Sequence, residues 1–317
     1  MIQTTTEVDL FTQWDIPWLV TCSLAVVALV YVRGWMRIRR TRSAQFPPWR
    51  LATFLAGIAA LFVALASPLD TFSETLLFMH MAQHFVLMSI APPLLVFGAP
   101  VVPMLRGLPK WLIRMLRPLF VSGALRSAGR FLTRPRVAWL AMAAAFVGWH
   151  IPRAYEFALA SENWHNFEHA CFFFTNLMFW WPVIRPSPSR LAPSRWMLIP
   201  YLLLADVVNT GISAFLCFAG RLLYPSYGLI PRPFGLGALD DQIAAGAFMW
   251  VCGSMVYLIP AVVIVTQLLS SGAYSTPVAQ SFVRSKLDRR EPAATGGSWR
   301  NAQREKPNRH SARAGAA

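Results

Sequence analysis

Charged residues are scarce in this sequence, and cysteines are few. Only 14% of the 317 residues are Asp, Glu, Lys or Arg, whereas 56% are hydrophobic and the mean hydropathy is +0.44. This is more apolar sequence than the core of one soluble domain can hold. The four cysteines form no CxxC pair, which argues against a disulfide framework and against a thiolate zinc site. The composition therefore favours a membrane protein.

Sequence motifs of soluble enzymes are also missing. There is no Gly-rich phosphate loop, no nucleophile motif and no evident internal repeat, so we expect a protein that is not an enzyme. No Lys or Arg precedes the first apolar run, which argues against a cleaved signal peptide. We expect that run to be retained as a helix.

Apolar runs of the length needed to cross a bilayer, roughly 17 to 25 residues, occur seven times. They cover about 16–32, 50–67, 76–98, 136–152, 166–184, 196–219 and 242–269. We therefore expect an all-α fold, a polytopic membrane helix bundle of about seven transmembrane helices within residues 1–269. Pro92 and Pro93 should kink the third helix or end its regular hydrogen bonding.

Lys and Arg are distributed unevenly between the two sets of loops. They concentrate after the first, third and fifth runs and in the tail, whereas only Arg153, Arg221 and Arg232 lie in the other loops. Cytoplasmic loops carry this excess, so we expect the N-terminus outside, the C-terminus inside and a bacterial plasma (inner) membrane location. The basic tail, 270–317, should be disordered. Contact with anionic lipid explains the net charge of +15 without a nucleic-acid partner.

Five histidines fall near the predicted outer ends of the helices. Two pairs are four residues apart and share a helix face, and a third helix contributes one more: His80, His84, His150, His165 and His169. Ionisable side chains inside a membrane are costly and mark functional sites. An imidazole set without thiolate suits copper, zinc or haem iron. The alternative is that these are interfacial residues that bond to carbonyls and water.

Other polar side chains and one Met are candidate accessory residues of the same layer: Asp70, Gln83, Glu168, Asp206, Asp241, Gln242 and Met249. Glu168 could orient the neighbouring imidazole. Asp241 could instead cap the free amides at the start of its own helix, and Met249 could simply fill the core. Asp206, with Asn209 one turn on, is either a buried hydrogen-bonded pair or an ion contact.

Several motifs in chain order resemble the CtaG family of assembly factors for caa(3)-type cytochrome c oxidase. They are ALASPLDTFSETLLFMHMAQHFVLMSIAPPLLVFGAP, WHIPRAYEFAL, NWHNFEHACFFFTNLMFWWPV, LYPSYG and DDQIAAGAFMWVCGSMVYL, and together they cover roughly residues 50–270. The resemblance implies a seven-span membrane protein that matures a haem-copper oxidase and is thought to supply its copper. It places family histidines at the five positions above and the family's acidic-Gln pair at Asp241 and Gln242.

From the resemblance and the histidines together we expect a copper site at the periplasmic face. Its partners would be cytochrome c oxidase subunits or a periplasmic copper chaperone, with membrane lipid around the helices. A haem-binding membrane electron carrier is the alternative, with haem as the cofactor and histidines as axial ligands. An ion transporter using Asp206 ranks third, because such proteins need a midplane site.

Overall fold

The computed structural model describes residues 17–41, 43–184, 194–230 and 235–273. Every regular element within these ranges is a helix, and no strand occurs in them. The chain divides into two units, Met1–Leu268 and Leu269–Ala317. The predicted cytoplasmic tail, residues 270–317, falls almost entirely outside the described ranges and stays a prediction.

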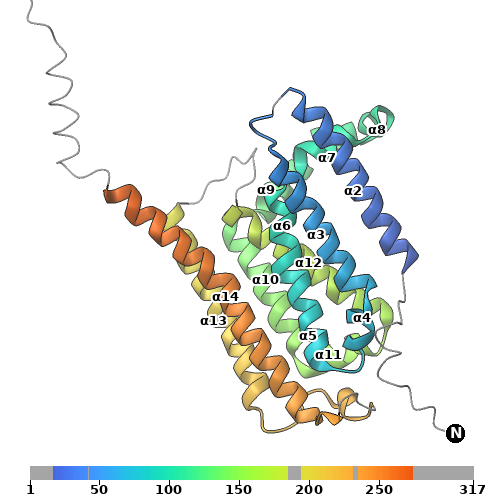
Figure 1. Cartoon of the computed structure of the whole chain (residues 1–317), viewed down its shortest axis with the longest axis vertical. Coiled ribbons are helices and arrows are strands. Elements are labelled where there is room, and N and C mark those ends of the chain that lie inside the picture. Colours follow the sequence, from blue (N-terminus) through green and yellow to red (C-terminus); the bar gives the residue numbers. More distant parts are fainter. Residues whose placement is uncertain (1–16, 42, 185–193, 231–234, 274–317) are drawn as a thin grey trace, which may run out of the picture. The chain divides into compact units, whose positions relative to one another are not determined.

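Each apolar run coincides with one long helical segment (Figure 1). These are α2 (Trp18–Arg39), α3 (Pro48–Ala66), α5 (Leu77–Phe85) continued by the π turn η1 (Val86–Ile90) and α6 (Ala91–Phe97), α10 (Pro135–His150), α12 (Glu162–Ile184), α13 (Arg195–Phe218) and α14 (Ala238–Ala273). The connections contain α4 (Pro68–Ser73), α7 (Val101–Gly107), α8 (Lys110–Val121), α9 (Gly123–Leu132), α11 (Pro152–Leu159) and the 3₁₀ turn η2 (Pro225–Gly228).

Five of the long segments are long and apolar enough to cross a membrane, counting only the part of the chain that the structure describes. They are α2, α3, the continuous α5 to α6 segment, α13 and α14. Helix α10 has 16 residues, and α12 carries polar side chains such as His165 and Glu168. The all-helical membrane fold is therefore supported, whereas the number of seven spans stays a prediction.

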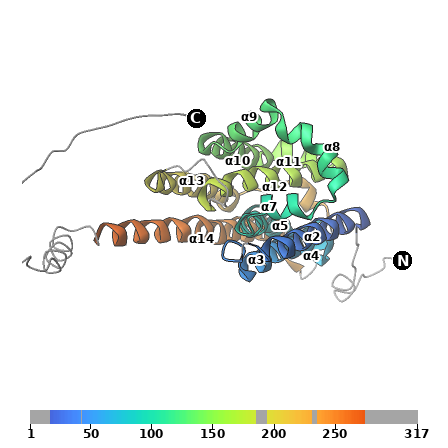
Figure 2. The same ribbon diagram turned by 90° about the horizontal axis from the view of Figure 1, so that it is seen from above.

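The α5 to α6 segment lies in the middle of the first unit. Helix α3 packs on one side of it and α12 on the other, while α2 packs outside α3 against α7 (Figure 2). Beyond α12 come α10 and then α13. Asn209 of α13 donates to the Met249 carbonyl of α14 at 3.2 Å. One hydrophobic core therefore forms between α2, α3 and α6, and a second forms among α5, α10, α12, α13 and α14.

The π turn η1 lies directly before Pro92 and Pro93, where regular α-helical hydrogen bonding cannot continue. In a regular helix the Met88 carbonyl would accept from the amide at position 92, which proline lacks. The Trp180 indole donates to this carbonyl instead, at 3.3 Å. A neighbouring helix thus satisfies the freed carbonyl, as apolar surroundings require.

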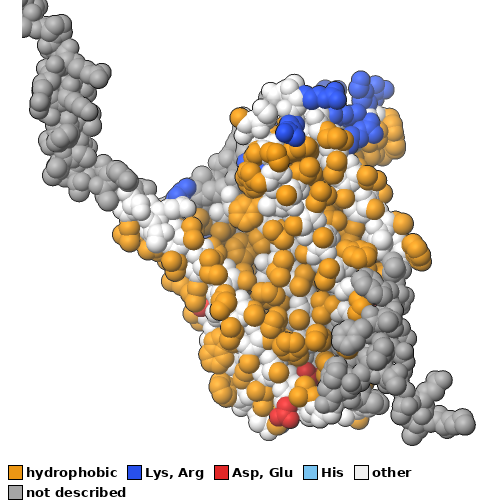
Figure 3. All heavy atoms as spheres, in the orientation of Figure 1, with side chains coloured by type: hydrophobic (Ala, Val, Ile, Leu, Met, Phe, Trp, Pro, Cys, Tyr) orange, Lys and Arg blue, Asp and Glu red, His pale blue; other side chains and the backbone are white. Residues whose placement is uncertain are grey.

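Charged side chains separate toward opposite ends of the visible face. Figure 3 shows most of the visible Lys and Arg gathered at the end where α2 stops and α7 and α8 begin, while most of the visible Asp and Glu lie toward the other end. Arg37 and Arg39 belong to this basic end, and Arg37 donates to the Arg106 carbonyl at 2.8 Å. The first turns of α5 and α12 lie toward the opposite end, about 30 Å away along the α5 to α6 segment by helical rise.

Two glycines allow α2 and α7 to touch backbone to backbone. A Cβ on Gly34 would lie 1.8 Å from the Pro103 carbonyl oxygen, and one on Gly107 would lie 1.8 Å from the Val30 carbonyl oxygen. Small residues at helix contacts in membranes permit this approach. The contact holds α2 against the rest of the unit.

Gly34→Ala should therefore destabilise the protein, because a Cβ at this position meets backbone that cannot rotate away. We expect a cost of about 1 to 3 kcal/mol, seen as a lower midpoint of thermal unfolding in detergent. Gly148→Ala in α10 is the matched control, since a Cβ there meets no atom within 4 Å. An equal midpoint for both variants would contradict the proposed role of the α2 to α7 contact.

Candidate metal centre

The start of α5 is fixed by a carboxylate from a distant helix. Asp241, in the first turn of α14, accepts hydrogen bonds from the amides of Leu77 at 2.8 Å and Phe78 at 3.0 Å. These amides have no partner within their own helix, and a negative charge favours the helix N-terminus. Asp241 therefore caps α5, a role that the sequence did not indicate. The turn that it holds carries His80.

Four of the five predicted histidines come together between α5 and α12. One ring nitrogen from each of His80, His84, His165 and His169 can be chosen so that all four lie within 4.8 Å of one another. The ring centroids are 4.3 Å apart for His80 and His84, and 4.2 Å apart for His165 and His169. Across the two helices, His80 stacks on His165 at 5.0 Å. His80, His84 and His169 are buried, and His165 is partly exposed.

Each of these four rings keeps a nitrogen without a hydrogen-bond partner. The unpartnered atoms are Nε2 of His80, His165 and His169 and both ring nitrogens of His84. Buried polar atoms nearly always have a hydrogen-bond partner, so a group of unpartnered ring nitrogens needs an explanation. Ligation of a metal ion through these lone pairs would satisfy them together. The donor set therefore fits an ion that prefers imidazole.

Tyr227 determines which nitrogen of His80 is free. Its hydroxyl donates to the Ser73 carbonyl at 2.9 Å and lies 3.0 Å from His80 Nδ1. Because the only phenolic proton is already committed to Ser73, Nδ1 must carry a proton and donate to the phenol oxygen. His80 Nε2 then holds the lone pair toward the other imidazoles. Burial raises the pKa of Tyr227 above its usual value, so the phenol stays protonated at neutral pH.

Sequence reasoning gave Tyr227 no role, although it lies in the LYPSYG motif. It reaches His80 from 147 residues away, in the turn η2 between α13 and α14. Tyr155 of α11 supports it, with the two hydroxyls 3.2 Å apart. Nothing in the local spacing of either tyrosine signals this contact.

The distances between the ring nitrogens of the cluster are close to the distances between nitrogens that ligate one metal ion. Two imidazole nitrogens on one ion at about 2.0 Å each lie at most about 4 Å apart, and somewhat closer in a tetrahedral site. The widest pair, at 4.8 Å, must therefore close by about 1 to 1.5 Å on binding. Coordination of one ion by all four rings would therefore require the side chains to move closer together.

His150, the fifth predicted ligand, is buried but is not one of the four. Its Nδ1 lies 2.7 Å from the Phe146 carbonyl and must carry the proton, because a carbonyl only accepts. Nε2 has no partner. Its ring centroid is 6.0 Å from that of Phe172, which in turn lies 4.7 Å from the His84 ring. His150 is therefore near the cluster but separate from it.

Two of the predicted accessory residues bond to backbone, and a third, Asp70, accepts from one of them. Gln83 donates to the Ala64 carbonyl at 2.8 Å and to the Asp70 carboxylate at 2.5 Å, which ties α5 to α3 and α4. Gln242 accepts from the Leu223 amide at 2.7 Å, and it donates to the Leu216 carbonyl in α13 and to the Arg221 carbonyl beyond the end of that helix. These contacts give Asp70, Gln83 and Gln242 positioning roles around the cluster.

The remaining accessory candidates differ more from expectation. Glu168 is buried, but neither carboxyl oxygen has a hydrogen-bond partner, so the expected bond to an imidazole is not formed. Asp206 has an unpartnered Oδ1, and Asn209, which the sequence offered as one possible partner, donates to the Met249 carbonyl. Met249 lines a cavity that also borders His84 and His150.

Curated proteins similar to this chain come from mycobacteria. An uncharacterized protein of Mycobacterium leprae is 27% identical over 84% of this chain, and one of Mycobacterium bovis is 27% identical over the same share. The chain spans 40% of the length of each of these relatives. No solved structure matches.

A family comparison agrees with the motifs quoted from the sequence. The profile described as cytochrome c oxidase caa3 assembly factor (Caa3_CtaG) matches residues 29–271. The matched range contains the histidine cluster, the Asp241 cap and Tyr227. The chain belongs to the caa3 cytochrome c oxidase assembly factor family, CtaG.

Proposed function

We propose that this protein binds copper transiently at the four-histidine cluster and passes it on during assembly of a haem-copper cytochrome c oxidase. The observation that carries the proposal is the convergence of four imidazoles, each with an unpartnered nitrogen, within 4.8 Å. Imidazole without thiolate suits copper. The assembly-factor family supplies the reason to handle copper, because the enzyme it serves contains that metal.

The site suits a cargo ion better than a permanently held one. The four nitrogens are slightly too far apart for simultaneous coordination, so binding costs rearrangement and release is eased. His165 is partly exposed and offers an entry, whereas the other three are buried. Glu168, next to His169 in the chain, is a buried carboxyl that would favour a cation. The four imidazole rings lie so close together that a small ion fits between them, whereas a haem does not.

The cluster lies at the end of the first unit away from the basic loops. By the rule that positive loops stay in the cytoplasm, this end is the periplasmic face of a bacterial plasma membrane. In this orientation α2, α3, α5 to α6, α10, α12, α13 and α14 form seven spans, with the N-terminus outside and the tail inside. Oxidase subunits or a periplasmic copper chaperone would receive the ion at that face.

Replacing His80 and His84 together by alanine should abolish copper binding at the cluster. The change removes half of the imidazoles, and the remaining pair on α12 offers one helix face only. Copper per chain, measured by mass spectrometry on protein purified in detergent after dialysis against copper, should fall by one equivalent relative to the wild type.

His310→Ala is the control for the double variant, because it removes a histidine that lies beyond the last apolar run. It should retain copper, and circular dichroism should show the same helix content in both. If the double variant keeps as much copper as the wild type, the cluster is not the binding site.

Tyr227→Phe should weaken copper binding without removing a ligand. The phenol fixes the protonated nitrogen of His80, and loss of such a support costs about 10- to 100-fold in metal affinity. Competition with a chromophoric copper chelator measures the change. Tyr224→Phe is the matched control, because the Tyr224 hydroxyl donates to the His150 carbonyl at 3.0 Å and not to the cluster. Equal affinities in the two variants would refute the supporting role.

A strain lacking this protein should lose haem-copper oxidase activity and regain it when copper is added to the medium. Excess copper can bypass a delivery factor, whereas it cannot replace a scaffold. Oxygen consumption with an oxidase-specific electron donor measures the activity. A deficit that persists at every copper concentration would point to a scaffolding role and away from delivery.

A further inference from the structure

A small cavity lies among the helices beside the histidine cluster. Its volume is about 30 Å³, which is room for one water or one ion. Helix α5 and η1 form one wall, and α10, α13 and α14 form the others. His84 belongs both to the cluster and to the cavity wall. The cavity is therefore next to the cluster without being part of it.

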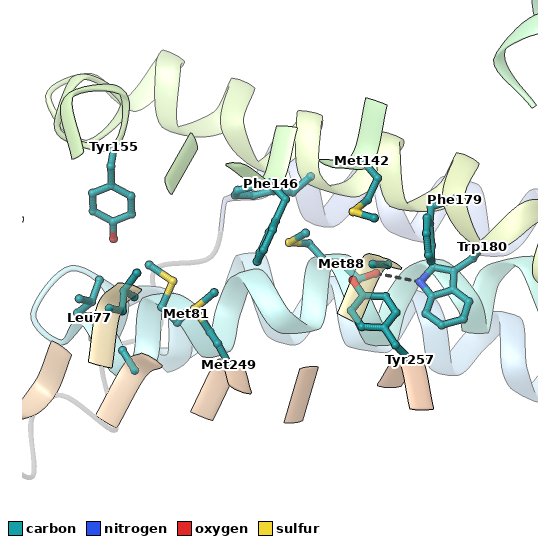
Figure 4. Packing of buried hydrophobic residues seen from close by; sticks show 14 of the residues in the cluster. Leu77, Met81, Met88, Met142, Phe146, Tyr155, Phe179, Trp180, Met249 and Tyr257 are labelled. Carbon is teal, nitrogen blue, oxygen red and sulfur yellow. Dashed lines mark hydrogen bonds between the residues drawn. The ribbon is translucent and has the colours of Figure 1, made fainter. Parts of the chain in front are cut away.

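Three methionines line this cavity from two directions. Met81 and Met88 come from α5 and η1, and Met249 comes from α14. Figure 4 shows Met81 and Met249 extending toward the same gap, with Met88 further along the segment. All three side chains are buried. Residues 81, 84 and 88 share one helical face, so two thioethers and an imidazole form one wall.

His150 is an independent indication that the cavity binds an ion or a small molecule. It is 2% exposed and lines the same cavity, and its Nε2 has no hydrogen-bond partner. Its Nδ1 proton is held by the Phe146 carbonyl at 2.7 Å, so the unpartnered Nε2 is the lone-pair nitrogen. An apolar packing role explains methionines alone, but it does not explain a buried imidazole acceptor among them.

We propose that the cavity is a second metal site, which takes a soft monovalent cation, Cu(I), through His150 Nε2 and the thioethers of Met81, Met88 and Met249. Thioether ligands select Cu(I) over Zn(II) and harder ions. His84 belongs to the cluster and also lines the cavity, so it lies between the two sites, and its single lone-pair nitrogen is assigned to the cluster. The choice of copper rests on the proposed function, whereas the existence of a soft-metal site rests on the cavity itself.

The two sites differ in ligand type and depth. Met88 is two helical turns beyond His80, about 12 Å along the axis, so the cavity extends further into the membrane. An ion that moves from imidazoles to thioethers exchanges ligands and keeps its oxidation state. The cluster and the cavity would bind the ion in turn, and the deeper cavity site would retain only Cu(I).

The test is Cu(I) titration of the full chain in detergent against a chromophoric Cu(I) chelator, with copper-edge X-ray absorption of the loaded protein. The wild type should bind two equivalents and show sulfur scattering. Met88→Leu with Met249→Leu should bind one equivalent and lose the sulfur signal, because leucine conserves volume without a donor atom. Met142→Leu is the matched control, since Met142 is 1% exposed in the same core but does not line the cavity.

A second pair of substitutions separates this inference from the proposed function. His80→Ala with His165→Ala removes cluster ligands that do not line the cavity, and it should leave one equivalent with sulfur scattering intact. If the methionine pair retains the wild-type stoichiometry, or if the wild type shows no sulfur scattering, the cavity site is refuted. If the histidine pair retains both equivalents while the methionine pair loses one, the cluster proposal fails and the cavity site stands.

Discussion

The constraint on which the rest of the structure depends is that four imidazoles, three of them buried, keep an unpartnered ring nitrogen inside an apolar helix bundle. Each buried nitrogen without a partner costs about 1 to 3 kcal/mol, and His80, His84 and His169 are all buried. No interaction among the described residues around them repays this cost. A metal ion bound by these nitrogens would repay it, which supports the proposal that the cluster is a metal site.

The surrounding structure holds the rings in place before any ion arrives. Asp241 fixes the first turn of α5 by capping two amides, and Gln83 ties the same helix to α3 and α4. Tyr227 anchors His80 through its Nδ1 and leaves Nε2 free. These polar groups, which in sequence look like further ligands or motif residues, are therefore committed to positioning. The imidazoles are left for the ion.

Local patterns in the sequence predicted much of this arrangement. The long helices follow from apolar runs, and the pairs at 80/84 and 165/169 follow from helical spacing. What spacing could not predict are contacts between distant segments: the cap from Asp241 to Leu77 spans 164 residues, and the bond between Tyr227 and His80 spans 147. For the same reason helical spacing could not show that His150 lies outside the group of four and lines the neighbouring cavity instead.

The most direct test of the account is nitrogen NMR of the histidine side chains during addition of Cu(I). Before copper, His80 should show a protonated Nδ1 and an unprotonated Nε2. The first equivalent should shift resonances of His80, His84, His165 and His169 together, while His310 stays unchanged as the internal reference. If the four do not respond as a group, or if only one of them shifts, no common ion is shared and the account is contradicted.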